Sequence, residues 1–211
     1  MATNIKATQK WTQKTSGGLN VVLFDRKFSI GKMTDQHWLT DKKLKKGSDV
    51  KIFCEDKTYE CHKIILSLQS EVFERMLDSN MAESKSGEIK IKGTSATTLE
   101  AILNFLYNEN LDKNEITGDL LIAADFYMIQ DLVTLCLQHL KANLTDQNAT
   151  EVMISAYKTN QKELFRLACS YVAKKMVEGL TLKKEALEKM KEEDPELAIE
   201  MMSEAMFNCK L

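Results

Sequence analysis

Histidine and cysteine are the residue types of this chain best suited to hold a metal ion or to act as a nucleophile. The closest group comprises Cys54, Cys61 and His62, but its spacing is not that of a paired zinc knuckle. Cys136, Cys169 and Cys209 are isolated cysteines, and the other histidines, His37 and His139, stand in no recognisable nucleophile or ligand pattern. Because a free cysteine behaves mostly as a small hydrophobic residue, we predict buried thiols and no metal site. For His62, where a strand meets a helix, we predict a structural hydrogen bond and not general-base catalysis.

The motifs of common enzyme classes are also missing from the sequence. It contains no glycine-rich phosphate loop, no G-x-S-x-G elbow and no H-E-x-x-H pair. We therefore expect a protein that is not an enzyme and that has no catalytic residues and no cofactor.

Composition narrows the classes of protein further. The 211 residues are 44% hydrophobic, enough for a core, and the 28% charged residues nearly cancel to a net charge of -2. Such a balance favours neither nucleic acid nor a membrane as a partner. No apolar run approaches the ~18 residues of a membrane span, and no basic-then-apolar leader opens the chain. The odd number of cysteines fits a reducing compartment, so we expect an intracellular protein of the nucleus, the cytoplasm or both.

The first part of the chain shows short strand and helix patterns. A strand-like run at 21–24 is the main feature of the first 32 residues. From Met33 onward, a helix capped by Thr34 is predicted. Alternating apolar residues at 50–54, followed by a turn and a second run that ends at Cys61, then predict a β-hairpin.

After the hairpin, apolar residues at three- and four-residue steps predict a single amphipathic helix that ends near Asp78. Its apolar positions are Ile65, Leu68, Val72, Phe73, Met76 and Leu77. The later predicted elements are a strand at 88–91, helices at 99–106 and 119–126, and further helices beyond residue 128. The last helix opens at Asp194, with Pro195 in its first turn. This order, strands first and then mostly helices, predicts an α+β fold.

Six short sequence motifs occur along the chain in a characteristic order. They are Gly47–Val50, Cys61–Ser67, Ser70–Leu77, Met81–Ser84, Phe105–Tyr107 and Leu120–Tyr127. Together they resemble the BTB/POZ family, and in particular its speckle-type POZ members, over residues 33–140. The resemblance implies a BTB/POZ fold, in which a small sheet is flanked by helices.

The resemblance also implies a division of the chain. Residues 33–142 correspond to the BTB/POZ domain, and residues 143–211 correspond to a helical three-box or partial BACK-like extension. Residues 1–32 resemble at most the last strands of a MATH domain, the substrate-binding domain of speckle-type proteins. They are too short for a complete MATH domain or for kelch repeats, so the resemblance does not indicate how a substrate would be recruited.

Two interaction sites are implied by the resemblance. Dimers of the family form through the N-terminal helix and the start of the helix after the hairpin. The corresponding positions in this chain are Met33, Trp38, Leu39, Leu44, Ile64 and Ile65. Cullin-3 adaptors of the family bind the N-terminal domain of cullin-3 through a hydrophobic-x-Glu motif, which Met81 and Glu83 match here. The residue types suit this role, because a methionine can enter an apolar pocket while a carboxylate hydrogen-bonds beside it.

The resemblance therefore implies a protein-interaction adaptor that pairs with itself or with other BTB proteins. As the substrate adaptor of a cullin-RING E3 ubiquitin ligase, it would bind cullin-3 and an unknown substrate protein. Two alternatives stay open. One is a BTB oligomerisation scaffold or transcriptional co-regulator, and the other is a standalone BTB partner that modulates full-length adaptors. The helices after the BTB region and the Met-x-Glu motif favour the ligase adaptor.

Overall fold

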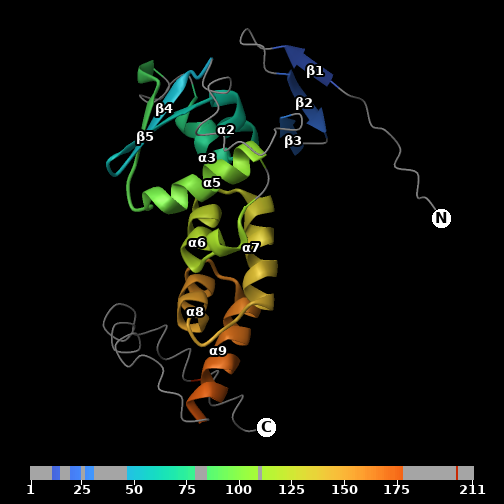
Figure 1. Cartoon of the computed structure of the whole chain (residues 1–211), viewed down its shortest axis with the longest axis vertical. Helices are drawn as coiled ribbons and strands as arrows, with labels where there is room; N and C mark the ends of the chain where they lie inside the picture. Colours follow the sequence, from blue (N-terminus) through green and yellow to red (C-terminus); the bar gives the residue numbers. More distant parts are fainter. Residues whose placement is uncertain are drawn as a thin grey trace, which may run out of the picture. The chain divides into compact units, whose positions relative to one another are not determined.

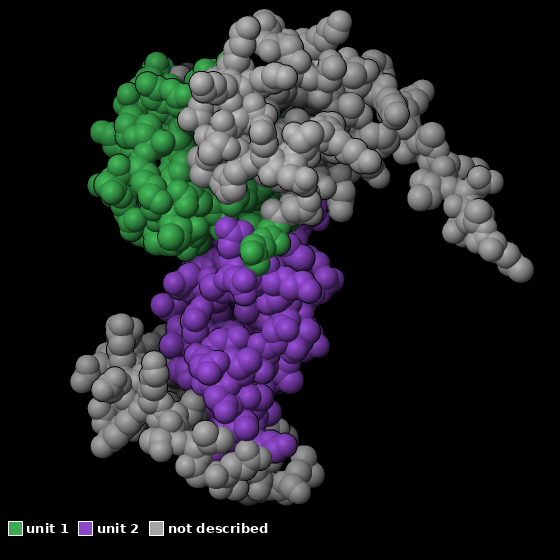
Figure 2. All heavy atoms as spheres, viewed as in Figure 1, with its two compact units in different colours: residues 1–112, 126–129 green, residues 113–125, 130–211 purple. Residues whose placement is uncertain are grey.

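The structure is a computed structural model, which describes residues 47–78, 85–108, 111–177 and 203, together with the strand backbones at 11–14, 20–24 and 27–30. The helix predicted from Met33, the Met81–Glu83 motif and all but Ser203 of the predicted last helix lie outside these residues. Two compact units make up the chain: residues 1–112 with 126–129, and residues 113–125 with 130–211 (Figure 2).

The strands form two separate three-stranded sheets (Figure 1). The first is an antiparallel meander of β1 (Trp11–Lys14), β2 (Asn20–Phe24) and β3 (Lys27–Ile30). Its central strand contains the run at 21–24 that the sequence predicts. The second sheet has the order β5–β4–β6, with β4 at Val50–Cys54, β5 at Lys57–Cys61 and β6 at Glu88–Ile91.

The predicted hairpin is confirmed as β4 and β5 of the second sheet. The strands pair antiparallel, with Ile52 opposite Tyr59, and β6 joins β4 in parallel. Val50, Ile52 and Cys54 are buried, whereas Lys51 between them is exposed. One face of the hairpin is therefore covered by the core, as a two-residue period requires.

The single helix predicted after the hairpin is wrong, because the segment forms two helices. They are α2 (Lys63–Gln69) and α3 (Glu71–Met76), and Ser70 between them has an extended backbone, with φ of -140° and ψ of 115°. The Ser70 hydroxyl accepts a hydrogen bond from the Phe73 N–H at 3.1 Å and donates one to the Tyr127 carbonyl at 2.6 Å. A serine side chain at an N-cap hydrogen-bonds backbone groups directly, and it thereby favours the start of a new helix over continuation of the previous one. One consequence is that Leu68, predicted to lie on the apolar face, is 45% exposed.

The core of the first unit lies between its second sheet and its helices. Helix α5 (Ala96–Asn108) contains the predicted 99–106 segment and buries four leucine and isoleucine side chains completely. They are Leu99, Ile102, Leu103 and Leu106. Phe73 of α3 stacks on Tyr127, with ring centroids 4.8 Å apart, and both rings are almost fully buried. Full burial of a side chain of this size stabilises the fold by about 1.5–3 kcal/mol.

The second unit consists mainly of helices. They are a short 3-10 turn (Lys113–Glu115), α6 (Gly118–Phe126), α7 (Gln130–Ala142), α8 (Ala149–Lys158) and α9 (Lys162–Val177). Helices α8 and α9 pack against each other through buried residues such as Val152, Met153, Leu164 and Phe165. The helical periodicity predicted beyond residue 128 is thus confirmed for α7, α8 and α9. No helix in the described part of the chain is both long and apolar enough to cross a bilayer.

Close packing at the start of α6 involves a glycine. The Gly118 N–H donates a hydrogen bond to the Glu151 carboxylate of α8 at 2.8 Å, and Thr117 Oγ1 accepts one from the Leu120 N–H at 3.2 Å. A Cβ atom at residue 118 would lie 2.9 Å from Ser155 Oγ. Only glycine allows α8 to approach this helix end so closely.

Candidate protein-interaction site

His62 ends the hairpin and precedes α2, where it forms a buried polar contact. Its backbone N–H donates to Tyr107 Oη at 2.9 Å, and its ring Nδ1 also lies 2.9 Å from that oxygen. Burial lowers the pKa of His62, although nearby Asp49 opposes the shift, and burial raises the pKa of Tyr107. The predicted structural hydrogen bond of His62 is therefore confirmed, and it ties the start of α2 to α5.

The cysteines of the described region are buried thiols, as predicted. Cys54, Cys61, Cys136 and Cys169 are all free and buried. Desolvation raises the pKa of Cys61 to about 12 and that of Cys136 to about 12. Because the thiolate is the reactive form, neither is set up as a nucleophile at neutral pH. The described residues contain no group of three or more histidine, cysteine or acidic side chains that could hold a metal ion.

Two of the six predicted dimer residues lie in the described region, both on α2. Ile65 is 0% exposed and packs inside its own protomer, whereas Ile64 is half-buried. Leu68 follows Ile64 by one helical turn, so the two share a face of α2. The periodicity after the hairpin predicts a single helix with Leu68 on its apolar face, and it therefore gives no sign that Leu68 lies at the surface. Met33, Trp38, Leu39 and Leu44 lie outside the described residues.

The Met81–Glu83 motif follows α3 in the sequence. Helix α3 is fixed by contacts with Tyr127. Tyr127 is locked against this helix by its stacking on Phe73 and by the hydrogen bond from Ser70 to its carbonyl. The residues on either side of Tyr127 are large apolar side chains that are exposed: Phe126 at 63% and Met128 at 42%. Met128 has a positive φ of 53°, which turns the chain sharply after α6.

The turn at 126–128 therefore presents an aromatic ring and a thioether beside the helix that leads to the motif. The Phe126 ring meets the Tyr127 ring edge-on, with centroids 5.1 Å apart. The exposed Phe126 ring therefore packs against a ring that is buried in the core. Sequence reasoning missed both residues as site candidates. The helical pattern at 119–126 suggested where α6 ends, but not which of its last side chains would stay uncovered.

The described residues form an α+β fold, in which small sheets are accompanied by helices. The family model for the BTB/POZ domain matches residues 40–144. This region of the chain is a BTB/POZ domain, and BTB/POZ domains pair with one another and bind other proteins.

Relatives of known sequence contain the same domain. A BTB/POZ domain-containing protein of Arabidopsis thaliana is 32% identical over 141 residues, which cover 66% of this chain and 57% of that protein. Kelch repeat and BTB domain-containing protein 2 of Pongo abelii is 28% identical over 132 residues, which cover 62% of this chain and 20% of that protein. The chain thus spans only part of the length of each relative.

Solved structures of BTB domains are also similar to this chain. The BTB domain of zebrafish PATZ1 is 24% identical, with a TM-score of 0.42, over 51% of this chain and 88% of that one. The BTB domain of human Gigaxonin is 25% identical, with a TM-score of 0.37, over 43% of this chain and 75% of that one.

Proposed function

We propose that this chain is a dimeric adaptor that binds the N-terminal domain of cullin-3 and serves a cullin-RING E3 ubiquitin ligase. The observation that carries the proposal is the exposed pair Phe126 and Met128, on a turn that is held against α3, the last described helix before the Met81–Glu83 motif in the sequence. The BTB/POZ domain supplies the general interaction role, and this pair adds a specific surface.

The chemistry of the turn fits a protein partner. Aromatic side chains and methionine are enriched in the cores of interfaces, where a ring on a rigid support loses little conformational entropy on binding. Phe126 is supported by the buried Tyr127 ring, and Met128 offers an adaptable thioether next to it. Together with Met81, they would give the cullin-3 N-terminal domain three apolar contacts, with Glu83 as the polar neighbour.

Dimerisation is proposed to use α2 and the helix predicted from Met33. Ile64 and Leu68 offer a partly exposed apolar face on α2. With Trp38 and Leu39 of the predicted helix, they would form a patch that a second copy covers in an isologous contact. Ile65 would then support this face from inside the protomer.

The proposal is tested by mixing the purified chain with the cullin-3 N-terminal domain and measuring the mass of the mixture by size exclusion with light scattering. We expect a complex of two chains with two cullin domains. A folded dimer that elutes separately from cullin would contradict the ligase role and leave BTB-mediated oligomerisation as the function.

A further inference from the structure

The turn at 126–128 exposes a methionine side chain. Met128 is 42% exposed, whereas its neighbours Tyr127 and Ile129 are 1% and 2% exposed. The Tyr127 carbonyl accepts the hydrogen bond from Ser70, and Met128 has a positive φ of 53°. Two buried neighbours and this left-handed backbone fix the course of the turn, so the Met128 side chain is held at the surface.

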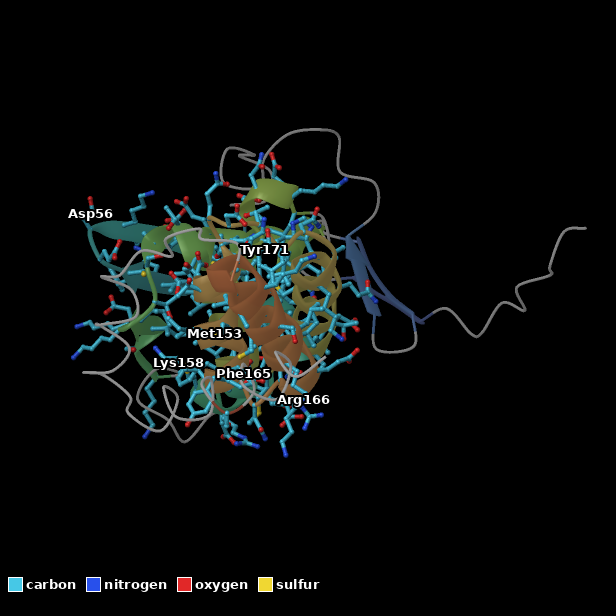
Figure 3. The ribbon with its side chains drawn as sticks, turned by 90° about the horizontal axis from the view of Figure 1, so that it is seen from below. Asp56, Met153, Lys158, Phe165, Arg166 and Tyr171 are labelled. Atoms are coloured by element: carbon cyan, nitrogen blue, oxygen red, sulfur yellow. The ribbon has the colours of Figure 1, made fainter. Side chains whose placement is uncertain are left out.

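The other methionines whose side chains the structure describes are less accessible. Met76, at the end of α3, is half-buried. Met153 of α8 is 0% exposed, and Figure 3 shows it among the helices of the second unit. Among the described side chains, Met128 is therefore the methionine that a dissolved oxidant reaches most easily.

The described cysteines do not compete with Met128 for an oxidant. Cys54, Cys61, Cys136 and Cys169 are all buried. Desolvation raises the pKa of Cys61 to about 12 and that of Cys136 to about 12. Oxidation of a cysteine proceeds from its thiolate, which is scarce at neutral pH when the pKa is this high. A thioether has no proton to lose, so its reaction depends on access to the sulfur.

We propose that Met128 is a site of reversible oxidation, at which a peroxide converts the thioether to a sulfoxide and makes the turn polar. Hydrogen peroxide transfers one oxygen atom to the sulfur, so that an S–O bond forms, the O–O bond breaks and water leaves. The sulfur gives up two electrons, which the peroxide accepts. A methionine sulfoxide reductase reverses the step with a dithiol, which becomes a disulfide while the oxygen leaves as water.

Oxidation at this place changes the surface used in the proposed cullin contact. Phe126, two positions before Met128, is 63% exposed, so the two side chains form one apolar surface on the turn. A sulfoxide would place a polar group where the partner presents apolar atoms, and its burial without a hydrogen bond is unfavourable. Oxidation would therefore weaken the contact and regulate the adaptor. This regulatory step rests on the proposed function, whereas the site of oxidation does not.

The site is tested by treating the folded full chain with hydrogen peroxide at neutral pH and following each methionine by peptide mass spectrometry. We expect Met128 to gain an oxygen about tenfold faster than Met153, which reacts only when the second unit opens. Met76 should react at an intermediate rate. The melting temperature after brief treatment shows whether the chain is still folded. A folded chain in which Met128 reacts no faster than Met153 would overturn the proposal.

Met128→Leu is the matched control, because leucine has a similar volume and cannot be oxidised. On hydrophobic interaction chromatography, peroxide should make the folded wild type elute earlier, because the turn becomes polar. The same treatment should shift Met128→Leu less. An equal shift in both proteins would place the change of surface at other methionines and overturn the proposal.

Calorimetric titration of the cullin-3 N-terminal domain tests the regulatory step. Oxidised wild type should bind about tenfold more weakly than untreated wild type, and methionine sulfoxide reductase should restore the affinity. Oxidised Met128→Leu should lose less affinity, and an equal loss in both proteins would overturn the regulatory step. Untreated wild type that does not bind would contradict the proposed function and this step with it, while the peptide mapping decides the oxidation site by itself.

Discussion

Ser70 separates α2 from α3 and holds the start of α3 in place. Its hydroxyl joins the start of α3 to the Tyr127 carbonyl and is itself almost completely buried. Loss of an N-cap costs about 0.5–2 kcal/mol, and a carbonyl left without a partner costs about 1–3 kcal/mol. We predict that Ser70→Ala lowers the free energy of unfolding by about 2–3 kcal/mol, measured by urea denaturation. Ser67→Ala, within α2, is the control, and an equal loss in both variants would contradict this role.

The buried His62 side chain should make the stability of the fold depend on pH. Its folded-state pKa lies below the ordinary value of 6.5, because burial disfavours the charged imidazole. The unfolded chain therefore takes up this proton first, and stability falls as the pH drops through 6.5 toward the folded pKa. We predict that wild type loses more stability between pH 7 and pH 5 than His62→Gln does. Parallel stability curves for the two proteins would contradict the assignment.

At the scale of elements, the hairpin was predictable and the break between α2 and α3 was not. Alternation at 50–54 is a local pattern, since a two-residue period places one face toward the core whatever the rest of the chain does. The extended backbone at Ser70 depends on the Tyr127 carbonyl, which is 57 positions away. Local periodicity could not reveal that partner, and it therefore continued one helix through Leu68 into α3.

The candidate site was predictable from the sequence only in part. The family strings indicate the Met81–Glu83 motif and the α2 face. The exposure of Phe126 and Met128 follows from how the chain turns after α6, where Met128 takes a positive φ. An apolar residue at the end of a helical pattern is usually a core residue, so the sequence gives no signal for the exposed pair.

The contact between α6 and α8 gives a prediction at the element scale. Alanine normally favours a helix over glycine by about 1 kcal/mol. At residue 118, however, its Cβ would lie 2.9 Å from Ser155 Oγ and 3.0 Å from the Glu151 carboxylate. We predict that Gly118→Ala destabilises the chain by about 1–3 kcal/mol, a typical cost of overpacking, and that its melting temperature falls. A stabilised Gly118→Ala would show that α8 does not approach α6 in this way.

At the scale of the whole molecule, we predict that the chain is a homodimer. Replacing an apolar residue of the dimer face by aspartate places an unpaired charge in a desolvated contact, which costs several kcal/mol. Light scattering at micromolar concentration should give twice the mass of one chain for wild type and the mass of a single chain for Ile64→Asp. Leu167→Asp, an exposed substitution on α9, should remain dimeric. A wild-type monomer, or a dimer unaffected by Ile64→Asp, would contradict the proposed interface.

The cullin contact is the central claim, and calorimetric titration of the cullin-3 N-terminal domain tests it most directly. Met81→Asp, Glu83→Lys and Phe126→Asp should each weaken binding by about 2–5 kcal/mol, because a charge without a partner would enter the interface. Phe126 is 63% exposed in the free chain, so its variant should keep the wild-type melting temperature, whereas Phe73→Asp should unfold the first unit. Leu167→Asp controls for the loss of an exposed apolar side chain elsewhere. Wild-type affinity in all three site variants, or no binding by folded wild type, would contradict the account.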